Sequence, residues 1–274
     1  MTGATGLVPG GHRPRKRFGQ HFLHDPGVIA RIVAAIDPRP TDAIIEIGPG
    51  RGALTGPLVA RAGHLEAIEL DRDLAAALAA SPLASAGLLT VHAADALAFD
   101  FEALARRRGQ RLRVVGNLPY NISTPLLFHL IEAADAIADL HLMVQREVAA
   151  RLAAAPGEAA YGRLGIMVQR RCRVELLLGV GPGAFQPPPR VQSAVVRLVP
   201  LPTPRGPPHD ETRFRELVRH AFSARRKTLR RGLAGLVDAA GFEQAAVDPG
   251  LRPEELSVED YARLARVSDG AARG

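Results

Sequence analysis

Cysteine is nearly absent from this sequence, since Cys172 is the only one among its 274 residues. A single cysteine excludes an internal disulfide and a zinc centre built on several cysteines. Cys172 begins an apolar segment and is predicted to be a core residue. Long apolar runs are missing too, and none could span a membrane. Because the first twelve residues also lack the apolar centre of a signal peptide, we expect a cytoplasmic protein.

Lysine is scarce as well. Lys16 and Lys227 are the only two, so arginine carries nearly all of the positive charge. The net charge is +7 at pH 7, and the isoelectric point is about 10.5. This basic balance suits a polyanionic partner such as nucleic acid better than a small acidic metabolite. The length is sufficient for a catalytic domain of ordinary size and a smaller second domain.

Alternating strand and helix patterns run from residue 43 to about residue 200 and predict a parallel, doubly wound sheet. Seven strands are expected, at residues 43–47, 65–70, 88–92, 113–116, 140–144, 173–179 and 194–199. A proline-containing loop precedes the last strand, which favours a hairpin-like antiparallel edge there. The fold class is therefore predicted to be α/β.

Three regions are expected along the chain. Residues 1–14 are predicted to be a disordered tail, because their beginning is glycine-rich and carries no periodic pattern. Residues 15–202 are assigned to the α/β domain. A proline-rich stretch at residues 200–210 is typical of a linker, and only helical periodicity follows it. Residues 203–274 are therefore expected to form a small all-helical domain.

A glycine-rich loop follows the first predicted strand. Residues 44–52 are Ile-Ile-Glu-Ile-Gly-Pro-Gly-Arg-Gly, and their glycines would let the backbone turn sharply and lie against a ligand. The dinucleotide fingerprint is G-x-G-x-x-G, whereas the third glycine here, Gly52, comes one residue early. This form, preceded by Glu46, is typical of S-adenosylmethionine sites rather than NAD sites. Simple turn chemistry stays an alternative for the loop alone.

Acidic residues follow at the ends of the next two strands. Glu69 lies about 20 residues after Gly48, a spacing that places a carboxylate to accept hydrogen bonds from ribose hydroxyls. Asp95 comes after the strand at 88–92, where its carboxylate could accept the adenine amine of the donor. Either residue alone would more often be a solvated loop charge. Their order at successive strand ends favours a nucleoside-containing methyl donor.

Asn117-Leu118-Pro119-Tyr120 follows the strand at 113–116, at the edge where open α/β sheets bind ligands. The tetrapeptide matches enzymes that methylate an exocyclic amine on a planar base. The lone pair of that amine is delocalised, so the site must accept hydrogen bonds from both of its N–H groups. The side-chain oxygen of Asn117 and the carbonyl of Leu118, exposed by the rigid turn at Pro119, are expected to accept them.

Tyr120 would offer a flat face for the base, a contact worth about 1–3 kcal/mol. A strand followed by a proline turn and a packed tyrosine stays an alternative for the tetrapeptide alone. The glycine loop and the two acidic residues decide between these interpretations, and together with the tetrapeptide they predict a methyltransferase.

Basic residues gather in two runs, one in the N-terminal arm and one in the predicted helical domain. Their members are Arg13, Arg15, Lys16, Arg17, Arg213, Arg215, Arg219, Arg225, Arg226, Lys227, Arg230 and Arg231. Such clusters neutralise phosphates and confer salt-dependent affinity, although a single run is more often a solvated helix face. Two runs that flank a base-methylation site favour RNA binding.

These motifs together resemble one family, the KsgA-type ribosomal RNA adenine dimethyltransferases, from residue 15 to about residue 267. The segments that carry the resemblance are Lys-Arg-Phe-Gly-Gln-His-Phe-Leu at 16–23, Glu-Ile-Gly-Pro-Gly at 46–50, Ile-Glu-Leu-Asp at 68–71, Gly-Asn-Leu-Pro-Tyr-Asn-Ile-Ser-Thr-Pro at 116–125, Phe-Gln-Pro-Pro-Pro-Arg-Val-Gln-Ser at 185–193 and Ala-Phe-Ser-Ala-Arg-Arg-Lys-Thr-Leu at 221–229. The combination is highly specific.

The resemblance implies a class I, Rossmann-like methyltransferase that uses S-adenosylmethionine, with a C-terminal RNA-binding domain. It implies dimethylation of N6 on two adjacent adenosines near the 3′ end of small-subunit (16S) ribosomal RNA, during maturation of the 30S subunit. The residues implied to contact the donor are His21, Leu23, Gly48, Gly50, Glu69, Asp95 and Asn117. Those implied to hold the base or the RNA are Tyr120, Phe185, Arg225, Arg226 and Lys227. No metal is expected, and a monomer is the default.

Three other functions share parts of this pattern. An Erm-type enzyme would dimethylate large-subunit ribosomal RNA and confer macrolide resistance, but the segment at 221–229 resembles the small-subunit type. A non-catalytic RNA-binding factor of the same fold would not need intact Glu69, Asp95, Asn117 and Tyr120. A DNA adenine methyltransferase shares the catalytic tetrapeptide and lacks support from the arm or the C-terminal domain.

Overall fold

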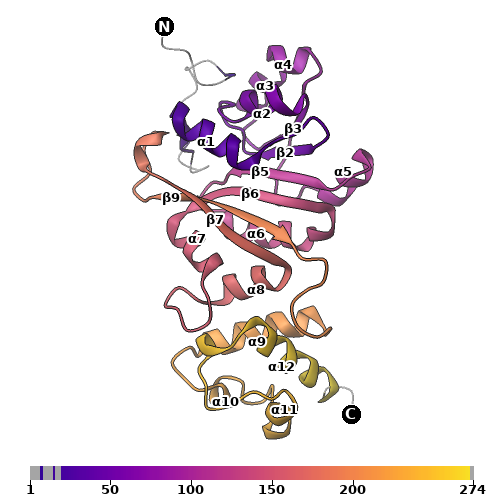
Figure 1. Cartoon of the computed structure of the whole chain (residues 1–274), viewed down its shortest axis with the longest axis vertical. Helices are drawn as coiled ribbons and strands as arrows, with labels where there is room; N and C mark the ends of the chain where they lie inside the picture. Colours follow the sequence, from indigo (N-terminus) through magenta and orange to yellow (C-terminus); the bar gives the residue numbers. More distant parts are fainter. Residues whose placement is uncertain (1–6, 9–14, 16–19, 272–274) are drawn as a thin grey trace. The chain divides into compact units, whose positions relative to one another are not determined.

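The computed structural model describes residues 7–8, 15 and 20–271. The described residues form two compact units (Figure 1). The first contains the residues up to Ala149 together with Glu175–Pro200, and the second contains Ala150–Val174 and the residues from Leu201 onward.

A seven-stranded sheet, in the order β4-β3-β2-β5-β6-β9-β7, forms the centre of the first unit (Figure 1). Its strands are β2 (Ala43–Ile47), β3 (Leu65–Glu69), β4 (Leu89–Ala93), β5 (Leu112–Asn117), β6 (Ile137–Gln145), β7 (Cys172–Val180) and β9 (Ser193–Pro200). The pairs from β4 through β6 are parallel. This arrangement confirms the predicted α/β fold class.

The last strand differs from the expectation in its position. β9 runs antiparallel to β6, and the sequence had predicted an antiparallel last strand. It was expected at the edge of the sheet, however, and it lies between β6 and β7, so β7 is the edge strand. The residues of β9 are mostly buried, whereas most residues of β7 are partly or fully exposed. The interior position beside β6 is thus taken by β9, and the edge is left to β7.

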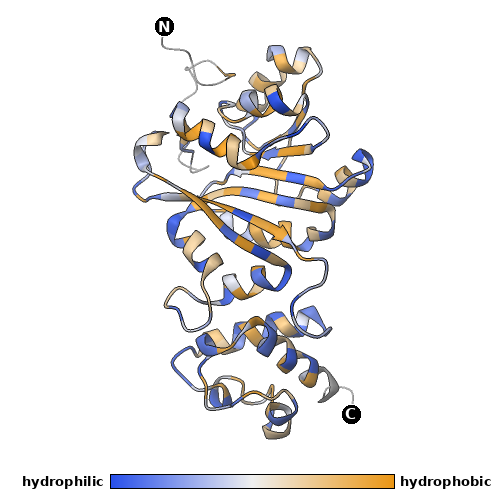
Figure 2. Ribbon diagram, in the orientation of Figure 1, coloured by the Kyte–Doolittle hydropathy of each residue, from blue (hydrophilic) through white to orange (hydrophobic). Residues whose placement is uncertain are grey.

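The sheet is buried because its central strands are apolar on both faces, as is typical of parallel strands covered by helices. Every residue of β3 is buried, and so are four of the five residues of β2. Figure 2 shows these strands coloured mostly as hydrophobic. The chain leaves β2 for β3 on one side and pairs β2 with β5 on the other, so a topological switch point lies between β2 and β5, where open sheets bind ligands.

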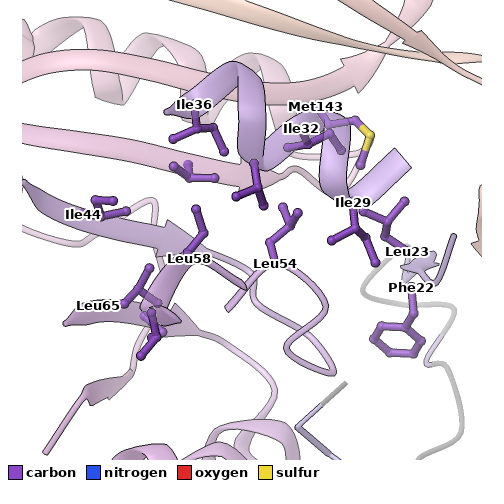
Figure 3. Packing of buried hydrophobic residues seen from close by; sticks show 14 of the residues in the cluster. Phe22, Leu23, Ile29, Ile32, Ile36, Ile44, Leu54, Leu58, Leu65 and Met143 are labelled. Carbon is purple, nitrogen blue, oxygen red and sulfur yellow. The ribbon is translucent and has the colours of Figure 1, made fainter. Parts of the chain in front are cut away.

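The helices of the first unit are α1 (Pro26–Ile36), α2 (Thr55–Ala62), α3 (Arg72–Ala79), α4 (Pro82–Ser85), α5 (Phe101–Arg108), α6 (Ser123–Glu132) and α7 (Arg146–Ala153, which ends in the second unit), with 3₁₀ turns η2 (Ala134–Ala136) and η3 (Pro182–Ala184). The N-cap Asp25 begins α1, since its side chain accepts a hydrogen bond from the amide of Val28 at 2.9 Å. The apolar face of α1 packs against Leu54 and Leu58 in the hydrophobic core (Figure 3).

The N-terminal arm is attached to the first unit by a short strand pair. β1 (Phe22–Leu23) pairs antiparallel with β8 (Phe185–Gln186). Leu7 and Val8 also pack on this unit, since Val8 is buried and its amide donates to the carbonyl of Arg51 at 3.2 Å. These two residues differ from the expected disorder of residues 1–14; apart from them, that predicted tail lies outside the described residues.

The second unit contains α8 (Arg163–Arg171), α9 (Glu211–Ser223), α10 (Leu229–Gly232), α11 (Ala239–Gln244) and α12 (Val258–Ala271), with the 3₁₀ turn η4 (Pro253–Glu255). α9 packs on both α12 and α8. The hydroxyl of Tyr161 donates to the carbonyl of Leu256 at 2.9 Å, and buried Arg170 pairs with Glu211 at 3.1 Å. Residues 150–174 thus group with the C-terminal helices, whereas the sequence-based division at residue 202 assigned them to the α/β domain.

Candidate active site

A cavity of about 320 Å³ lies at the carboxyl ends of β2, β3 and β5, a volume typical of small-molecule sites. Its wall combines the arm at 20–23, the glycine loop, the ends of β3 and β5, and the loop after β4. Nine of the residues predicted from the sequence line it: His21, Leu23, Gly48, Gly50, Glu69, Asp95, Asn117, Leu118 and Tyr120. The structure therefore brings together residues that are far apart in the chain and that the sequence predicts to bind the donor and the base.

The glycine loop has the backbone that its sequence predicts. Gly48, Gly50 and Gly52 have φ angles of +65°, +58° and +81°, a region in which other residues are strained. A Cβ on Gly50 would also lie 3.0 Å from the Phe22 ring. The loop can thus follow the cavity wall closely only because these positions carry no side chain.

Glu69 is held in place by two backbone amides. Its carboxylate accepts hydrogen bonds from Gly50 at 3.0 Å and from Asp71 at 2.9 Å, one on each oxygen. Burial raises the pKa of Glu69, and these amide hydrogen bonds oppose that shift. Each carboxylate oxygen has more than one lone pair, so Glu69 can still accept hydrogen bonds from a ligand.

Glu46 is a second buried carboxylate on the cavity wall, with 2% of its surface exposed. One of its oxygens accepts a hydrogen bond from the hydroxyl of Thr55 at 2.6 Å. Burial raises the pKa of Glu46 to about 7, the Thr55 hydrogen bond opposes the shift, and the neighbouring charge of Glu69 adds to it. The sequence marked Glu46 only as the acidic residue before the glycine loop, and Thr55 carried no signal.

The Asn117 side chain is oriented by the N-terminal arm. Its Nδ2 donates to the carbonyl of His21 at 3.1 Å, which leaves Oδ1 as the acceptor that Asn117 can offer to a ligand. The amide of the next residue, Leu118, donates to the carbonyl of Met143 on β6 at 3.0 Å. These two bonds attach the predicted catalytic segment to the arm on one side and to the sheet on the other.

Tyr120 and His21 form a stacked pair at the cavity. Their ring centroids are 5.7 Å apart with an angle of 30° between planes. The Tyr120 hydroxyl is 2.7 Å from the hydroxyl of Ser193, and His21 Nδ1 donates to the carbonyl of Pro187 at 2.8 Å. Burial raises the pKa of Tyr120, so its hydroxyl stays neutral near pH 7. The sequence indicates no role for Ser193 beyond its place as the last residue of the segment at 185–193.

Phe185, which was predicted to hold the base opposite Tyr120, does not lie beside Tyr120 at the cavity. It is 2% exposed, pairs with Leu23 through the β1–β8 ladder and belongs to the core cluster that contains Phe22. Among the described residues, it is not one of those that line the cavity. A contact between Phe185 and a base therefore stays a prediction.

The predicted RNA-binding residues lie in the second unit. Arg225, Arg226 and Lys227 are exposed just after α9. Arg225 donates to the carbonyl of Ala159 at 3.2 Å and lies 3.6 Å from the carboxylate of Glu254. The other two side chains are available to phosphates.

The basic run of the arm is only partly described. Arg13, Lys16 and Arg17 lie outside the described residues. Arg15 pairs with the buried carboxylate of Asp71 at 2.9 Å, and Gln20 donates to the same carboxylate at 3.1 Å. Arg15 thus fastens the arm beside the cavity, a use that the sequence did not indicate.

Cys172, metal-binding clusters and membrane-spanning helices were the subjects of three expectations from the sequence. Cys172 is fully buried, and burial raises the pKa of its thiol to about 12, as expected of a core cysteine. Over residues 20–271 and the described part of the arm, no group of three or more histidine, cysteine, aspartate or glutamate side chains could hold a metal ion. Of the helices in that same part of the chain, none has both the length and the apolarity needed to cross a membrane.

Comparisons with known proteins identify the family of this chain. The family model "Ribosomal RNA adenine dimethylase" matches residues 11–269. A protein of Chromobacterium violaceum named "Ribosomal RNA small subunit methyltransferase A" is 54% identical over 264 residues, which is 96% of this chain and 99% of the relative.

Two solved structures are similar over most of the chain. A dimethyladenosine transferase from Plasmodium falciparum has a TM-score of 0.75 and 27% identity, over 89% of this chain and 96% of that one. The 23S rRNA methyltransferase ErmE has a TM-score of 0.69 and 26% identity, over 90% and 99% of the two chains.

Proposed function

Because this chain belongs to the ribosomal RNA adenine dimethylase family, we propose that it transfers methyl groups from S-adenosylmethionine to N6 of two adjacent adenosines in small-subunit ribosomal RNA. The observation that carries the proposal is the single cavity that contains both the glycine loop with Glu69 and the segment Asn117–Tyr120. A donor site and an amine-acceptor site must share one cavity for direct transfer between them.

The cavity residues fit the proposed methyl donor. The glycine loop offers a surface without side chains, and Glu69 offers carboxylate oxygens for ribose hydroxyls. Asp95, whose carboxylate already accepts the amide of Leu97 at 2.9 Å, would accept the adenine amine. S-Adenosylmethionine, when bound, supplies an electrophilic methyl group on a positively charged sulfur. His21, Leu23 and the glycine loop would enclose it.

The base side of the cavity would make N6 a better nucleophile. The side-chain oxygen of Asn117 and the carbonyl of Leu118 would accept hydrogen bonds from the two N–H groups of the amine, which localises the lone pair on the nitrogen. Tyr120 would stack on the base, and its raised pKa means that it acts as a neutral ring rather than as a base. Catalysis would then come from positioning and from hydrogen bonding, and the residues require no covalent enzyme intermediate.

The substrate is proposed from the relatives. The 54% identical relative is named for the small ribosomal subunit, whereas the 23S rRNA enzyme is 26% identical. The small subunit is therefore favoured over the large one, and the exposed Arg226 and Lys227 suit RNA phosphates. We further propose that the substrate is the immature 30S subunit, that the protein acts in the cytoplasm where subunits mature, and that it acts as a monomer.

Transfer of labelled methyl from S-adenosylmethionine to purified ribosomal subunits that lack their native adenine dimethylation tests this function. We expect label on the small subunit, in adjacent dimethyladenosines, and loss of that label with Asn117→Ala. Label only on large-subunit RNA would assign the Erm-type activity instead. Donor binding without transfer to either subunit would indicate a non-catalytic RNA-binding factor.

A further inference from the structure

The segment Phe185–Ser193 contacts both rings of the stacked pair at the cavity. The carbonyl of Pro187 accepts the hydrogen bond from His21 Nδ1 at 2.8 Å, and the hydroxyl of Ser193 bonds to the hydroxyl of Tyr120 at 2.7 Å. Neither contact is predicted by the spacing of these residues along the chain. The segment therefore does more than bring Phe185 into the core.

Ser193 is held firmly by its own surroundings. It is fully buried and is the first residue of β9, where it lies opposite Gln145 of β6. The residue before it, Gln192, accepts the backbone amide of Arg146 at 2.9 Å and the Arg146 guanidinium at 2.6 Å. The backbone of Ser193 is therefore fixed, and its side-chain hydroxyl has little freedom to move with the Tyr120 ring.

The backbone near Tyr120 is attached to β6, the strand with which Ser193 also pairs. The amide of Leu118 donates to Met143 of β6, and the carbonyl of Tyr120 accepts the Ser123 hydroxyl at 3.1 Å. The Tyr120 ring is thus held at its backbone end by β6 and at its hydroxyl end by a residue that is itself paired with β6. Fixing both ends of a side chain is what holds a functional group in one rotamer.

We propose that Ser193 is a positioning residue for methyl transfer, whose hydroxyl holds the Tyr120 ring so that a stacked base presents N6 to Asn117. This inference rests on the proposed function. A hydrogen bond between two neutral hydroxyls contributes little to overall stability, but a misplacement of about 1 Å at the reacting atoms can cost about 100-fold in rate. A large rate effect with a small stability effect is therefore the signature of positioning.

The second methylation should depend on Ser193 more than the first. Unmodified N6 has two protons, so Asn117 and Leu118 can both help to hold it. After one methylation a single proton remains, and one of these acceptors loses its partner. Stacking on a fixed Tyr120 then carries more of the positioning. Loss of the Ser193 hydroxyl should therefore shift the products from dimethyladenosine toward monomethyladenosine.

A double-mutant cycle on small subunits that lack adenine dimethylation tests the proposal. Ser193→Ala and Tyr120→Phe remove the same hydrogen bond from its two ends. We expect each to lower the single-turnover rate on the order of tenfold and to accumulate monomethyladenosine, and we expect the double variant to be no slower than Tyr120→Phe. Ser81→Ala, which removes another buried serine hydroxyl of the first unit, should leave rate and products unchanged.

Melting temperature and donor affinity, measured on each variant, separate positioning from damage to the fold. Both should stay close to those of the wild type in Ser193→Ala. If that variant unfolds, the rate and product ratio of Tyr120→Phe test the proposal on their own. A wild-type rate and product ratio in the single variants, or rate losses that multiply in the double variant, would overturn the proposal. Failure of the wild-type protein to methylate the subunits would instead count against the proposed function.

Discussion

Asn117 and His21 are joined by a hydrogen bond from the side-chain Nδ2 of the first to the backbone carbonyl of the second, at 3.1 Å. The two residues are 96 positions apart in the chain. Asn117 is the last residue of β5, so this bond links the end of the strand to the N-terminal arm. It also sets the orientation of the Asn117 side-chain amide. The arm is thereby part of the proposed base-binding side of the cavity as well as of its proposed donor side.

Asn117→Asp should therefore fail to replace asparagine, although it keeps an acceptor oxygen. The carboxylate has no proton to donate at neutral pH, so an oxygen would face the His21 carbonyl and the side chain would turn away. We expect Asn117→Asp and Asn117→Ala both to lose about 100-fold or more in transfer rate, as for loss of one hydrogen bond at a reacting centre. RNA affinity, measured by filter binding, should stay nearly unchanged; a near-normal rate in Asn117→Asp would contradict this orientation.

Glu46 should make donor binding depend on pH. Its pKa is raised to about 7, so the side chain is mostly neutral at pH 6 and mostly ionised at pH 8. An ionised Glu46 attracts the positive donor and a neutral one does not. The donor Kd, measured by calorimetry, should therefore fall by up to about tenfold between pH 6 and pH 8.

Glu46→Gln is the matched control for this dependence. The amide keeps the shape of the side chain but cannot ionise, so the part of the Kd change that disappears in this variant is the part that belongs to Glu46. A Kd for the wild type that does not change with pH would contradict the role of Glu46.

The stability of the first unit should fall in acid because of His141. Burial lowers the pKa of His141 from 6.5 to about 4, and among the charged groups that face it Asp139 and Glu175 oppose the shift while Arg113 and Arg197 add to it. The folded state keeps the ring neutral, so the stability that this provides is present above pH 6.5 and lost as the pH falls toward 4. The loss should be about 3 kcal/mol.

Urea unfolding at pH 7.5 and pH 4.5 measures this loss of stability. Other groups also titrate in that range, so the comparison with His141→Gln, which cannot take up the proton, isolates the histidine. The variant should lose less free energy of unfolding than the wild type between the two pH values. Equal losses in both proteins would show that His141 does not titrate as described.

Replacement of Arg225, Arg226 and Lys227 by alanine should weaken RNA binding. These side chains are exposed on the second unit, and each phosphate contact that they make contributes about 0.7–0.9 to the slope of log affinity against log salt concentration. The triple variant should show a smaller slope in RNA titrations at several salt concentrations, with an unchanged donor affinity. An unchanged slope would mean that this run is a solvated surface of the helical unit.

The main features of the fold and of the cavity could be predicted because their signals are local. A glycine loop after an apolar strand requires positive φ angles, and the loop has them at Gly48, Gly50 and Gly52. The position of Glu69 follows from the length of one strand–helix–strand unit, because parallel strands end at the same edge of the sheet. Asn117–Tyr120 could be placed at that edge for the same reason.

Only the tertiary structure decided which partners hold these residues. The bonds from Asn117 to His21, from Tyr120 to Ser193 and from Arg15 to Asp71 join segments that are 96, 73 and 56 residues apart. No periodicity or spacing along the chain predicts such contacts, because they depend on how helices, strands and loops pack together in the folded protein. The interior position of β9 and the grouping of residues 150–174 with the C-terminal helices have the same origin. The sequence by itself determined most of the chemical groups that line the cavity, because their signals are local, whereas long-range packing kept Phe185 out of it and set how the other groups are oriented.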